Sequence, residues 1–322
     1  MRRILSLLLC LMCFQSALAQ KKQNIYYLKF DGQHVEVKDS ADFIRIIQEP
    51  DSGSLNFRVF EYYPDKTLRF LGAVSSFDPQ LVFEGPSKRF YKNGKQEEIV
   101  SYKNGIPVGT AFQFHTNGKL HRILEHGDEG IHVRLAWNKS YHYKVKELYD
   151  STGVAIVKDG KGYVKEKDDA FIGEGLYLNG MREGLWKFTR ADKAVTSEET
   201  FAAGKFLSGK VINSDGSSRT YDKEALTPEF KGGMDGFNRY LSRKIQFPAD
   251  AMRLGITGKV YVSFVVEADG SISDIKLLNR IYPSLDREAL RVIARSPEWI
   301  PGQQHGIPVR VVFNVPVSYQ FY

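Results

Sequence analysis

The stretch FPADAMRLGITGKVYVSFVVEADGSISD, from Phe247 to Asp274, decides the fold of the C-terminal part, and LDREALRVIARSPEWIPG follows it from Leu285 to Gly302. From Val260 to Val266 every second residue is apolar, and this period of two predicts a strand. The turn signal Ala268-Asp269-Gly270 ends that strand, and Ser271 to Ile281 reads as the returning one. The stretch therefore predicts a β-hairpin.

A helix is predicted to follow the hairpin. Ser284 is its expected N-cap, because a serine oxygen can accept from the free amides of a first helical turn. Apolar residues recur at helical spacing after it, and Pro297 prevents extension far beyond Arg295. The stripe consists of Leu285, Ala289, Val292 and Ile293.

The final run, from Ile307 to Tyr322, alternates again and predicts a third strand. Pro308 and Pro316 place it at the edge of a sheet, because proline lacks the amide that a central strand must donate. Two arrangements remain open. Either the edge offers its backbone to another chain, or the helix or the N-terminal part covers it.

Five separated motifs in this region stand in an order that resembles the C-terminal domain of TonB. They are the pair Phe247-Pro248, the short helix Ala249 to Leu254, Gly258 before the strand, the turn Asp269-Gly270 and the step Pro301-Gly302. The resemblance covers Phe230 to Tyr322. It implies an α+β domain in which helices face a three-stranded antiparallel sheet.

The resemblance also implies a binding strand. In TonB the last strand adds to a short N-terminal segment, the TonB box, of an outer-membrane receptor, a known mode of peptide capture. Carried over, that strand is Val309 to Val317, and a proline at Val311 is expected to abolish addition while leaving most of the core. The partner-binding residues so implied are Val309, Arg310, Val311, Val312, Phe313 and Val315.

The N-terminus predicts a secretory signal peptide over residues 1–19, and hence a periplasmic protein. Arg2-Arg3, the apolar run Ile4 to Phe14 and the pattern Ala17-Leu18-Ala19 indicate cleavage before Gln20. The apolar run is shorter than the roughly 20 residues that span a bilayer. The alternative is retention as an uncleaved anchor. Both cysteines, Cys10 and Cys13, lie inside this segment, so the mature chain has no disulfide.

An aromatic residue followed by an Asn-Gly turn recurs in the first two hundred residues of the mature chain. The copies are Tyr91 to Lys95, Tyr102 to Gly105, His115 to Lys119 and Tyr177 to Gly180. Asn-Gly suits a type I′ turn, so each copy is expected to close a hairpin. Stacked hairpins give an elongated array, and the pattern resembles MORN-type repeats. Between Gly127 and Lys167 the spacing is irregular, which indicates an insertion or two subarrays.

The expected fold is α+β, with three parts in the mature chain. A MORN-like β-hairpin array spans residues 20–222, and a TonB-like domain spans 234–322. Between them, residues 223–233 are expected to be a linker, because Pro228 and Gly232-Gly233 interrupt the periodicity.

Little in the sequence predicts catalysis. His121, His126 and His132 are spaced for neither one helix face nor one strand face, so we expect solvated or turn histidines and no metal site. Asp168-Asp169 and Glu198-Glu199 are neighbours that point apart into polar surroundings. Catalytic motifs and a mature thiol are absent, which predicts a protein that is not an enzyme and has no cofactor.

The abundant aromatic residues suit either a carbohydrate-stacking surface or the core of the repeats, and we favour the core. The net charge of +7 falls to +5 when Arg2 and Arg3 leave with the signal peptide, and no dense basic tract remains. This modest charge does not favour nucleic acid as a partner.

Two functions compete, both based on a protein partner in the envelope. In the first, the C-terminal domain captures a segment of a partner such as a TonB-dependent outer-membrane receptor, in connection with transmembrane transport. In the second, the array is the binding surface of a periplasmic scaffold, and the C-terminal domain docks or forms a homodimer. TonB has a membrane anchor and a long spacer, which this chain lacks, so contact with the motor proteins ExbB and ExbD is not expected.

Overall fold

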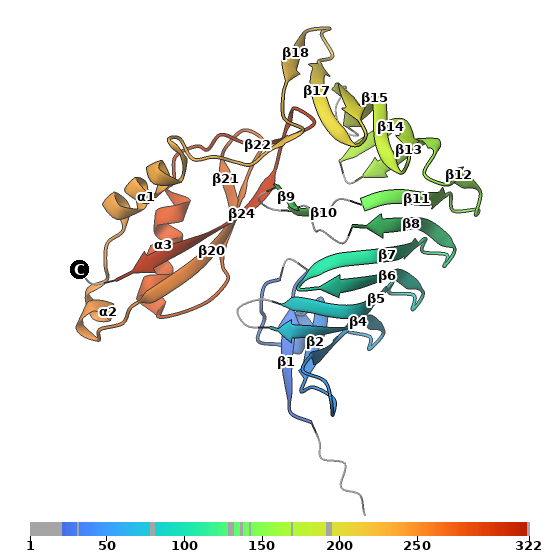
Figure 1. Ribbon diagram of the computed structural model, residues 1–322. Coiled ribbons are helices and arrows are strands. Elements are labelled where there is room, and N and C mark those ends of the chain that lie inside the picture. Colours follow the sequence, from blue (N-terminus) through green and yellow to red (C-terminus); the bar gives the residue numbers. More distant parts are fainter. Residues whose placement is uncertain are drawn as a thin grey trace, which may run out of the picture.

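The computed structural model describes residues 21–320 except 31, 78–80, 128–131, 136–137, 142, 169 and 191–194. The predicted signal peptide therefore lies outside the described residues. A long, curved array of strands makes up most of the chain, and a smaller domain of helices and strands stands beside one end of it (Figure 1). The chain is thus mostly β, with its helices gathered in the C-terminal domain.

The first part of the array is a ten-stranded antiparallel sheet in which each strand pairs with its neighbour along the chain. A single 3-10 turn, η1 (Lys38–Ser40), lies between its first two strands. The strands are β1 (Gln23–Leu28), β2 (Phe43–Gln48), β3 (Phe57–Tyr62), β4 (Leu68–Ser76), β5 (Val82–Phe90), β6 (Gln96–Lys103), β7 (Ile106–Phe114), β8 (Leu120–His126), β11 (Tyr143–Tyr149) and β12 (Ala155–Val157).

A six-stranded antiparallel sheet continues the array, and a separate hairpin is inserted between β8 and β11. Both explanations of the irregular spacing after Gly127 are therefore correct. The inserted hairpin consists of β9 (His132–Leu135) and β10 (Asn138–Tyr141), and the second sheet of β13 (Gly162–Asp168), β14 (Phe171–Leu178), β15 (Met181–Arg190), β16 (Thr196–Ala202), β17 (Lys205–Ile212) and β18 (Ser218–Tyr221).

One hydrophobic cluster joins the two sheets of the array. Val100 and Leu124 from the first sheet belong to the same buried cluster as Val164 and Trp186 from the second. Burial of such side chains is the main favourable term in folding. Most buried rings of the array, Trp186 among them, lie in this core, in agreement with the expected core role of the aromatic residues.

The Asn-Gly turns are of two kinds. At Asn104-Gly105 and Asn179-Gly180 both residues have positive φ, as the expected type I′ turn requires. The expectation is wrong at Asn93-Gly94 and Asn117-Gly118, where only the glycine has positive φ. There the asparagine side chain caps its own turn, because Asn117 Oδ1 accepts from the amide of Lys119 at 2.9 Å. This bond favours a wider turn closed by the glycine.

These wider turns lie at one end of the strands of the first sheet, and side-chain hydrogen bonds link each turn to the next. Asn93 Nδ2 donates to the carbonyl of Thr116 at 2.9 Å, and Asn117 Nδ2 repeats the contact one turn later, with Ser151 at 2.8 Å. The lysine two residues after Asn117 also bonds to the next turn, since Lys119 Nζ donates to the carbonyl of Thr152 at 2.6 Å. The sequence repeat therefore encodes a ladder of side-chain bonds from each turn to the next.

Replacing Asn117 by alanine is expected to lower the free energy of unfolding of the array by about 1–2 kcal/mol, because the cap and the bond to Ser151 are both lost. Asn117→Asp is the matched control, since it keeps the capping oxygen but cannot donate. We expect it to cost less than the alanine variant, measured by urea unfolding. Equal losses would show that the cap contributes nothing, and an Asn117→Asp chain as stable as the wild type would show that the bond between turns contributes nothing.

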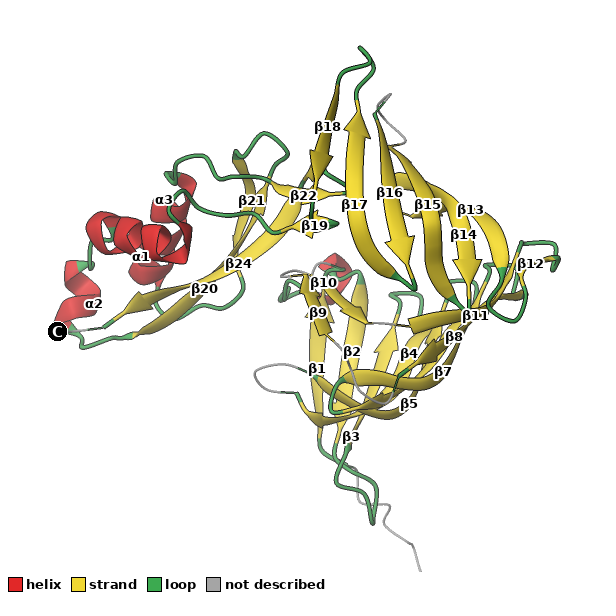
Figure 2. Ribbon diagram, turned by 45° about the horizontal axis from the view of Figure 1, so that its top comes forward, coloured by secondary structure: helices red, strands yellow, loops and turns green. Residues whose placement is uncertain are grey.

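The C-terminal domain packs its helices on one face of a three-stranded antiparallel sheet, as expected (Figure 2). The order in the sheet is β21-β20-β24, so the last strand lies at an edge. The elements are α1 (Gly233–Lys244), α2 (Ala249–Arg253), β20 (Gly258–Val266), β21 (Ile272–Leu277), α3 (Pro283–Ala294) and β24 (Val311–Tyr319).

Two local expectations for this domain are wrong. Ser284 is not the N-cap of α3, because Pro283 already occupies the first helical position and Tyr282 precedes it; proline has the φ that this position needs. The final run is not one strand. Its first part, β23 (Ile307–Val309), pairs with β22 (Gly302–Gln304) in another sheet, and β24 begins only after Arg310.

The expected linker is partly a strand. Within residues 223–233 lies β19 (Ala225–Leu226), which pairs with β22 and so completes a second small sheet, β19-β22-β23. The tip of the β22–β23 hairpin contacts the six-stranded sheet, where Ile307 joins the cluster of buried residues of the array. The C-terminal domain is therefore attached to the array by packing as well as by the chain.

Candidate functional site

The candidate site is the outer edge of β24. This strand pairs with β20 over its whole length, from Val266 opposite Val311 to Gly258 opposite Tyr319. Among the described residues, no other strand pairs with the opposite edge of β24. An edge of this kind presents unpaired backbone groups to a further strand.

The hydrogen bonds of Tyr261 show which residues of β24 face outward. Its amide donates to Asn279 Oδ1 at 2.7 Å and its carbonyl accepts from Leu278 at 2.8 Å, so both groups point to the β21 side. Its partner on β24, Pro316, must then point away from β20. Since direction alternates along a strand, Val312, Asn314 and Ser318 also direct their amides and carbonyls outward. Pro316 offers a carbonyl alone.

The sequence expectation for a proline at Val311 changes accordingly. Val311 lies on the alternate set, whose backbone bonds are made with β20. A proline there would break the domain's own ladder and would not test the outer edge. The positions that test the edge are the outward ones.

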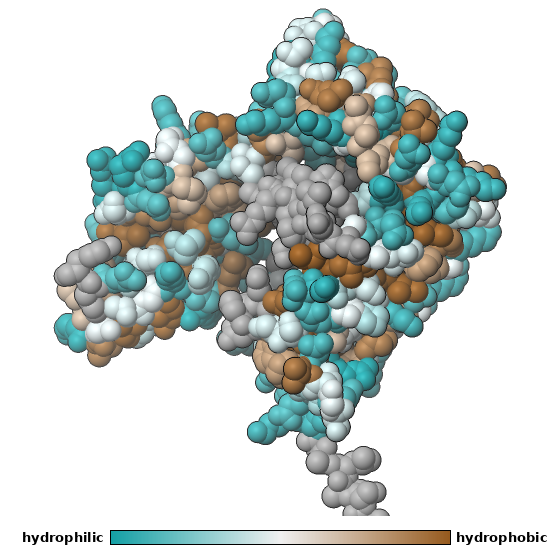
Figure 3. Space-filling model, in the orientation of Figure 1, coloured by the Kyte–Doolittle hydropathy of each residue, from teal (hydrophilic) through white to brown (hydrophobic). Residues whose placement is uncertain are grey.

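Side chains on the two faces of β24 have different surroundings. Val315 and Val317 are buried beneath the helices, and Tyr319 donates its hydroxyl to the carbonyl of Leu285 at 3.1 Å. Burial raises the pKa of Tyr319 well above its ordinary value, so this phenol stays a donor. On the other face Val312 is 56% exposed and Tyr261 44%. Figure 3 shows apolar surface over the region of β20 and β24.

Two salt bridges of Arg310 hold the start of β24. Arg310 Nε lies 3.1 Å from Glu267 Oε2, and its Nη2 lies 2.9 Å from Asp274 Oδ2. The hydrogen bonds to Glu267, with its charge, raise the pKa of Arg310. The guanidinium thus ties the entry of β24 to the hairpin formed by β20 and β21.

The implied binding residues are not all in one strand. Four of them lie in β24: Val311, Val312, Phe313 and Val315. Val309 lies in β23, where it pairs with Gly302 of β22, and Arg310 lies between β23 and β24. The chain changes sheets here, which the alternating pattern does not reveal. Of the four implied binding residues that lie in β24, only Val312 directs its backbone to the outer edge.

The motif residues that carry the resemblance have structural positions. Phe247 meets the ring of Tyr319 edge to face at 5.7 Å, and Pro248 directly precedes α2. Asp269 Oδ1 accepts from the amide of Ser271 at 2.9 Å, which shapes the hairpin turn. Gly270 has a φ of 88° and accepts from the amide of Trp299 at 2.8 Å.

The remaining motif residues lie where two segments of the chain come close together. Gly258 opens β20, and a Cβ there would lie 2.7 Å from Ile281. Pro301 precedes β22, whose first residue is Gly302. A Cβ on Gly302 would lie 2.7 Å from Val311, so this glycine lets β24 pass close to β22.

Sequence reasoning missed a polar cluster where the β22–β23 hairpin meets the array. Glu199, Glu224 and His305 bring their ligand atoms within 4.8 Å of one another, the one such group among the described residues. His305 Nδ1 lies 3.0 Å from Glu199 Oε1, and Arg182 Nη1 lies 2.7 Å from Glu224 Oε1. These partners explain the cluster as an ion-pair and hydrogen-bond network, so it gives no reason to place a metal.

Two expectations about titratable side chains are corrected here. Glu199 is fully buried, and its Oε1 lies 3.0 Å from His305 Nδ1 and accepts from the hydroxyl of Tyr221 at 2.7 Å. Burial, followed by the Glu199 carboxylate, raises the pKa of Tyr221. His126 is not solvated, because it is 8% exposed and burial lowers its pKa. The side chains of His132, Asp168 and Asp169 lie outside the description.

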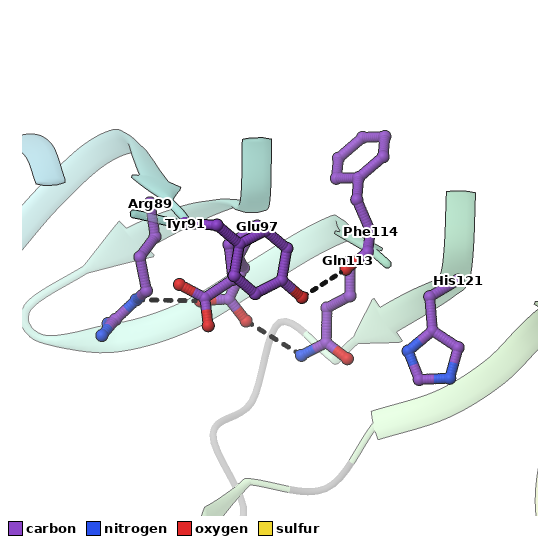
Figure 4. Close-up of a pocket in the computed structure, with 7 residues that line it drawn as sticks. Arg89, Tyr91, Glu97, Gln113, Phe114 and His121 are labelled. Carbon is purple, nitrogen blue, oxygen red and sulfur yellow. Dashed lines mark hydrogen bonds and ion pairs between the residues drawn. The ribbon is translucent and has the colours of Figure 1, made fainter. Parts of the chain in front are cut away.

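A polar hollow of about 350 Å³ lies on the array (Figure 4). Two of its side chains donate within the hollow: Gln113 Nε2 donates to Glu98 Oε1 at 2.9 Å, and Tyr91 donates to the carbonyl of Phe114 at 2.6 Å. His121 also lines a second hollow of about 220 Å³. Neither hollow gathers a nucleophile with a base that could activate it.

One known family matches the sequence of the C-terminal part. The family model described as Gram-negative bacterial TonB protein C-terminal matches residues 243–321. This C-terminal part of the chain belongs to the TonB C-terminal domain family. Its TonB domain includes β20, β21, α3 and β24, whereas the array lies outside the match.

Solved structures of TonB domains are similar in sequence to part of this chain. A solution structure of the Helicobacter pylori TonB C-terminal domain is 30% identical over 27% of this chain and 91% of that one, with a TM-score of 0.22. A longer form of it is 29% identical over 28% of this chain and 80% of that one, with a TM-score of 0.23. None of the curated proteins matches this chain.

Membership of this family supports a role in protein interaction at the bacterial envelope. The TonB domain is a non-enzymatic, transport-associated interaction domain. In the described part of the chain, no helix is both long enough and apolar enough to cross a membrane.

Proposed function

We propose that this chain is a periplasmic interaction protein whose TonB domain binds an extended segment of a partner by strand addition along β24. The observation that carries the proposal is the outer edge of this strand, where Val312, Asn314 and Ser318 direct both backbone groups away from β20. Main-chain bonds supply the affinity in such complexes, and side-chain pockets supply the choice.

The partner class proposed is the N-terminal segment of a TonB-dependent outer-membrane receptor. Membership of the TonB family supports this class. The periplasm follows from the proposed signal peptide, and the repeated turn ladder supports a MORN-like reading of the array. In this proposal the array takes the place of the long spacer of TonB.

The test is a calorimetric titration of the full chain, without residues 1–19, with synthetic peptides of receptor N-terminal segments from the same organism. We expect one peptide class to bind at one site per chain and to protect the amides of Val312 and Asn314 from hydrogen exchange. Scrambled peptides of equal composition are the control. If no receptor segment binds, the proposed partner class is wrong.

A further inference from the structure

The tip of the β22–β23 hairpin fits into the end of the array. His305 is 4% exposed and stacks on the ring of Phe188 with centroids 3.6 Å apart. Its carbonyl accepts from Ser197 Oγ at 2.6 Å, and its ring meets the buried Glu199. Its amide donates to the carbonyl of Glu224 at 2.9 Å. The array therefore satisfies the carbonyl and the side chain of this one residue, and the segment just before β19 satisfies its amide.

The two residues after His305 fit the same surface. A Cβ on Gly306 would lie 2.5 Å from the ring of Tyr221 and 2.8 Å from Val211, so the chain there lies directly against the array. Ile307 is 4% exposed within the hydrophobic cluster of the array. Arg190 Nη1 then donates to the carbonyl of Pro308 at 3.0 Å. Apolar contact and directed hydrogen bonds together fix the hairpin.

The docked hairpin leads directly into the candidate binding strand. Val309 packs against the cluster of the array, and Val311 begins β24 two residues later. Val311 also fills the space beside Gly302 of β22, so the start of β24 rests on the hairpin itself. Phe313 and Val315, further along the first half, pack in the core of the TonB domain. The far half, around Val317 and Tyr319, rests on the helices of the TonB domain.

We propose that docking of the β22–β23 hairpin into the array holds the first half of β24 in the extended conformation that a partner strand requires. His305 and Ile307 are then positioning residues for the binding edge, and the array contributes to partner binding by holding the hairpin in place. The link to partner capture rests on the proposed function, but the effect on β24 does not. By linkage, a partner on β24 and the docked hairpin stabilise each other.

The experiment follows hydrogen exchange in the full chain by mass spectrometry, without any partner. In the double variant His305→Ala/Ile307→Ser, we expect the amides of β24 that bond to β20 to exchange faster. The increase should be at least about tenfold at Val311, Phe313 and Val315 and less than about threefold at Val317 and Tyr319. Leu207→Ser is the matched control, because Leu207 is 52% exposed on the same sheet and leaves the hairpin docked. Asparagine in place of alanine at position 305 keeps a donor for Glu199. The variant His305→Asn/Ile307→Ser should therefore show part of the protection from exchange that His305→Ala/Ile307→Ser loses.

Ser197→Ala provides a milder variant on the array side, should the double variant unfold, because it removes the bond to the carbonyl of His305 and keeps the side chains of the hairpin. The proposal is overturned if residues 305–309 lose protection in either variant while residues 311–315 keep theirs. A receptor peptide added afterwards should bind at least about tenfold more weakly to the undocked chain. If the wild type binds no peptide at all, the partner class fails, and the exchange result still decides the coupling.

Discussion

Replacing Asn314 by proline is expected to weaken binding of a receptor segment to β24 by about 10- to 100-fold, while the TonB domain keeps its fold. The amide of Asn314 points to the outer edge, so proline removes a donor that the domain itself does not use. It leaves a carbonyl of the partner strand unpaired, at a cost of about 1–3 kcal/mol. Calorimetric titration with the bound peptide measures the loss.

Phe313→Pro is the matched control for this variant. Phe313 directs its backbone toward Phe264 of β20, so a proline there breaks the internal ladder and is expected to unfold the sheet. The two neighbouring substitutions should therefore have different effects: Asn314→Pro lowers the affinity for the peptide, and Phe313→Pro lowers the thermal stability of the domain. Full binding by a folded Asn314→Pro chain would place the partner away from this edge. Partners that the variant retains would belong to the array, as in a scaffold.

Much of the C-terminal fold could be predicted from the sequence, because its signals are local. The alternation over Val260 to Val266 and the turn at Asp269-Gly270 act on neighbouring residues, and the structure has the hairpin they predict. Pro316 correctly indicated an edge strand. The break at Arg310 could not be predicted, because residues on both sides of it alternate equally well. Only the packing of Ile307 on the array decides that the chain changes sheets.

The same limit explains the missed interface. Glu199 sits beside Glu198 in a sequence that suggests two solvated carboxylates, yet a strand has two faces and the array is covered at this point by the hairpin. His305-Gly306 reads only as a loop between two short strands. The partners of His305 in the array, Ser197 and Glu199, are more than a hundred residues before it, and no periodicity connects such distant positions. The turns illustrate the opposite case, since Asn93 and Asn104 share one dipeptide but differ in φ.

Replacing Trp299 by alanine is expected to cost the TonB domain about 3–5 kcal/mol, the usual range for removing a large buried ring. Trp299 is 3% exposed and lies at the centre of four aromatic rings, with centroids 5.2 to 5.4 Å away. These rings come from the segment before α1, from α1, from β20 and from β24. They belong to Phe230, Phe237, Phe264 and Phe313.

A loss of this size is a large part of the stability of a small domain, so the domain is expected to unfold first and the array later. Because the chain then has two transitions, each is followed by its own probe: amide exchange at Val262 for the domain and at Val164 for the array. Trp299→Phe is the control, since it keeps a ring but loses the bond from the indole to Ser296 Oγ at 3.0 Å. A single shared transition in Trp299→Ala would instead mean that the docked hairpin makes the domain and the array one cooperative unit.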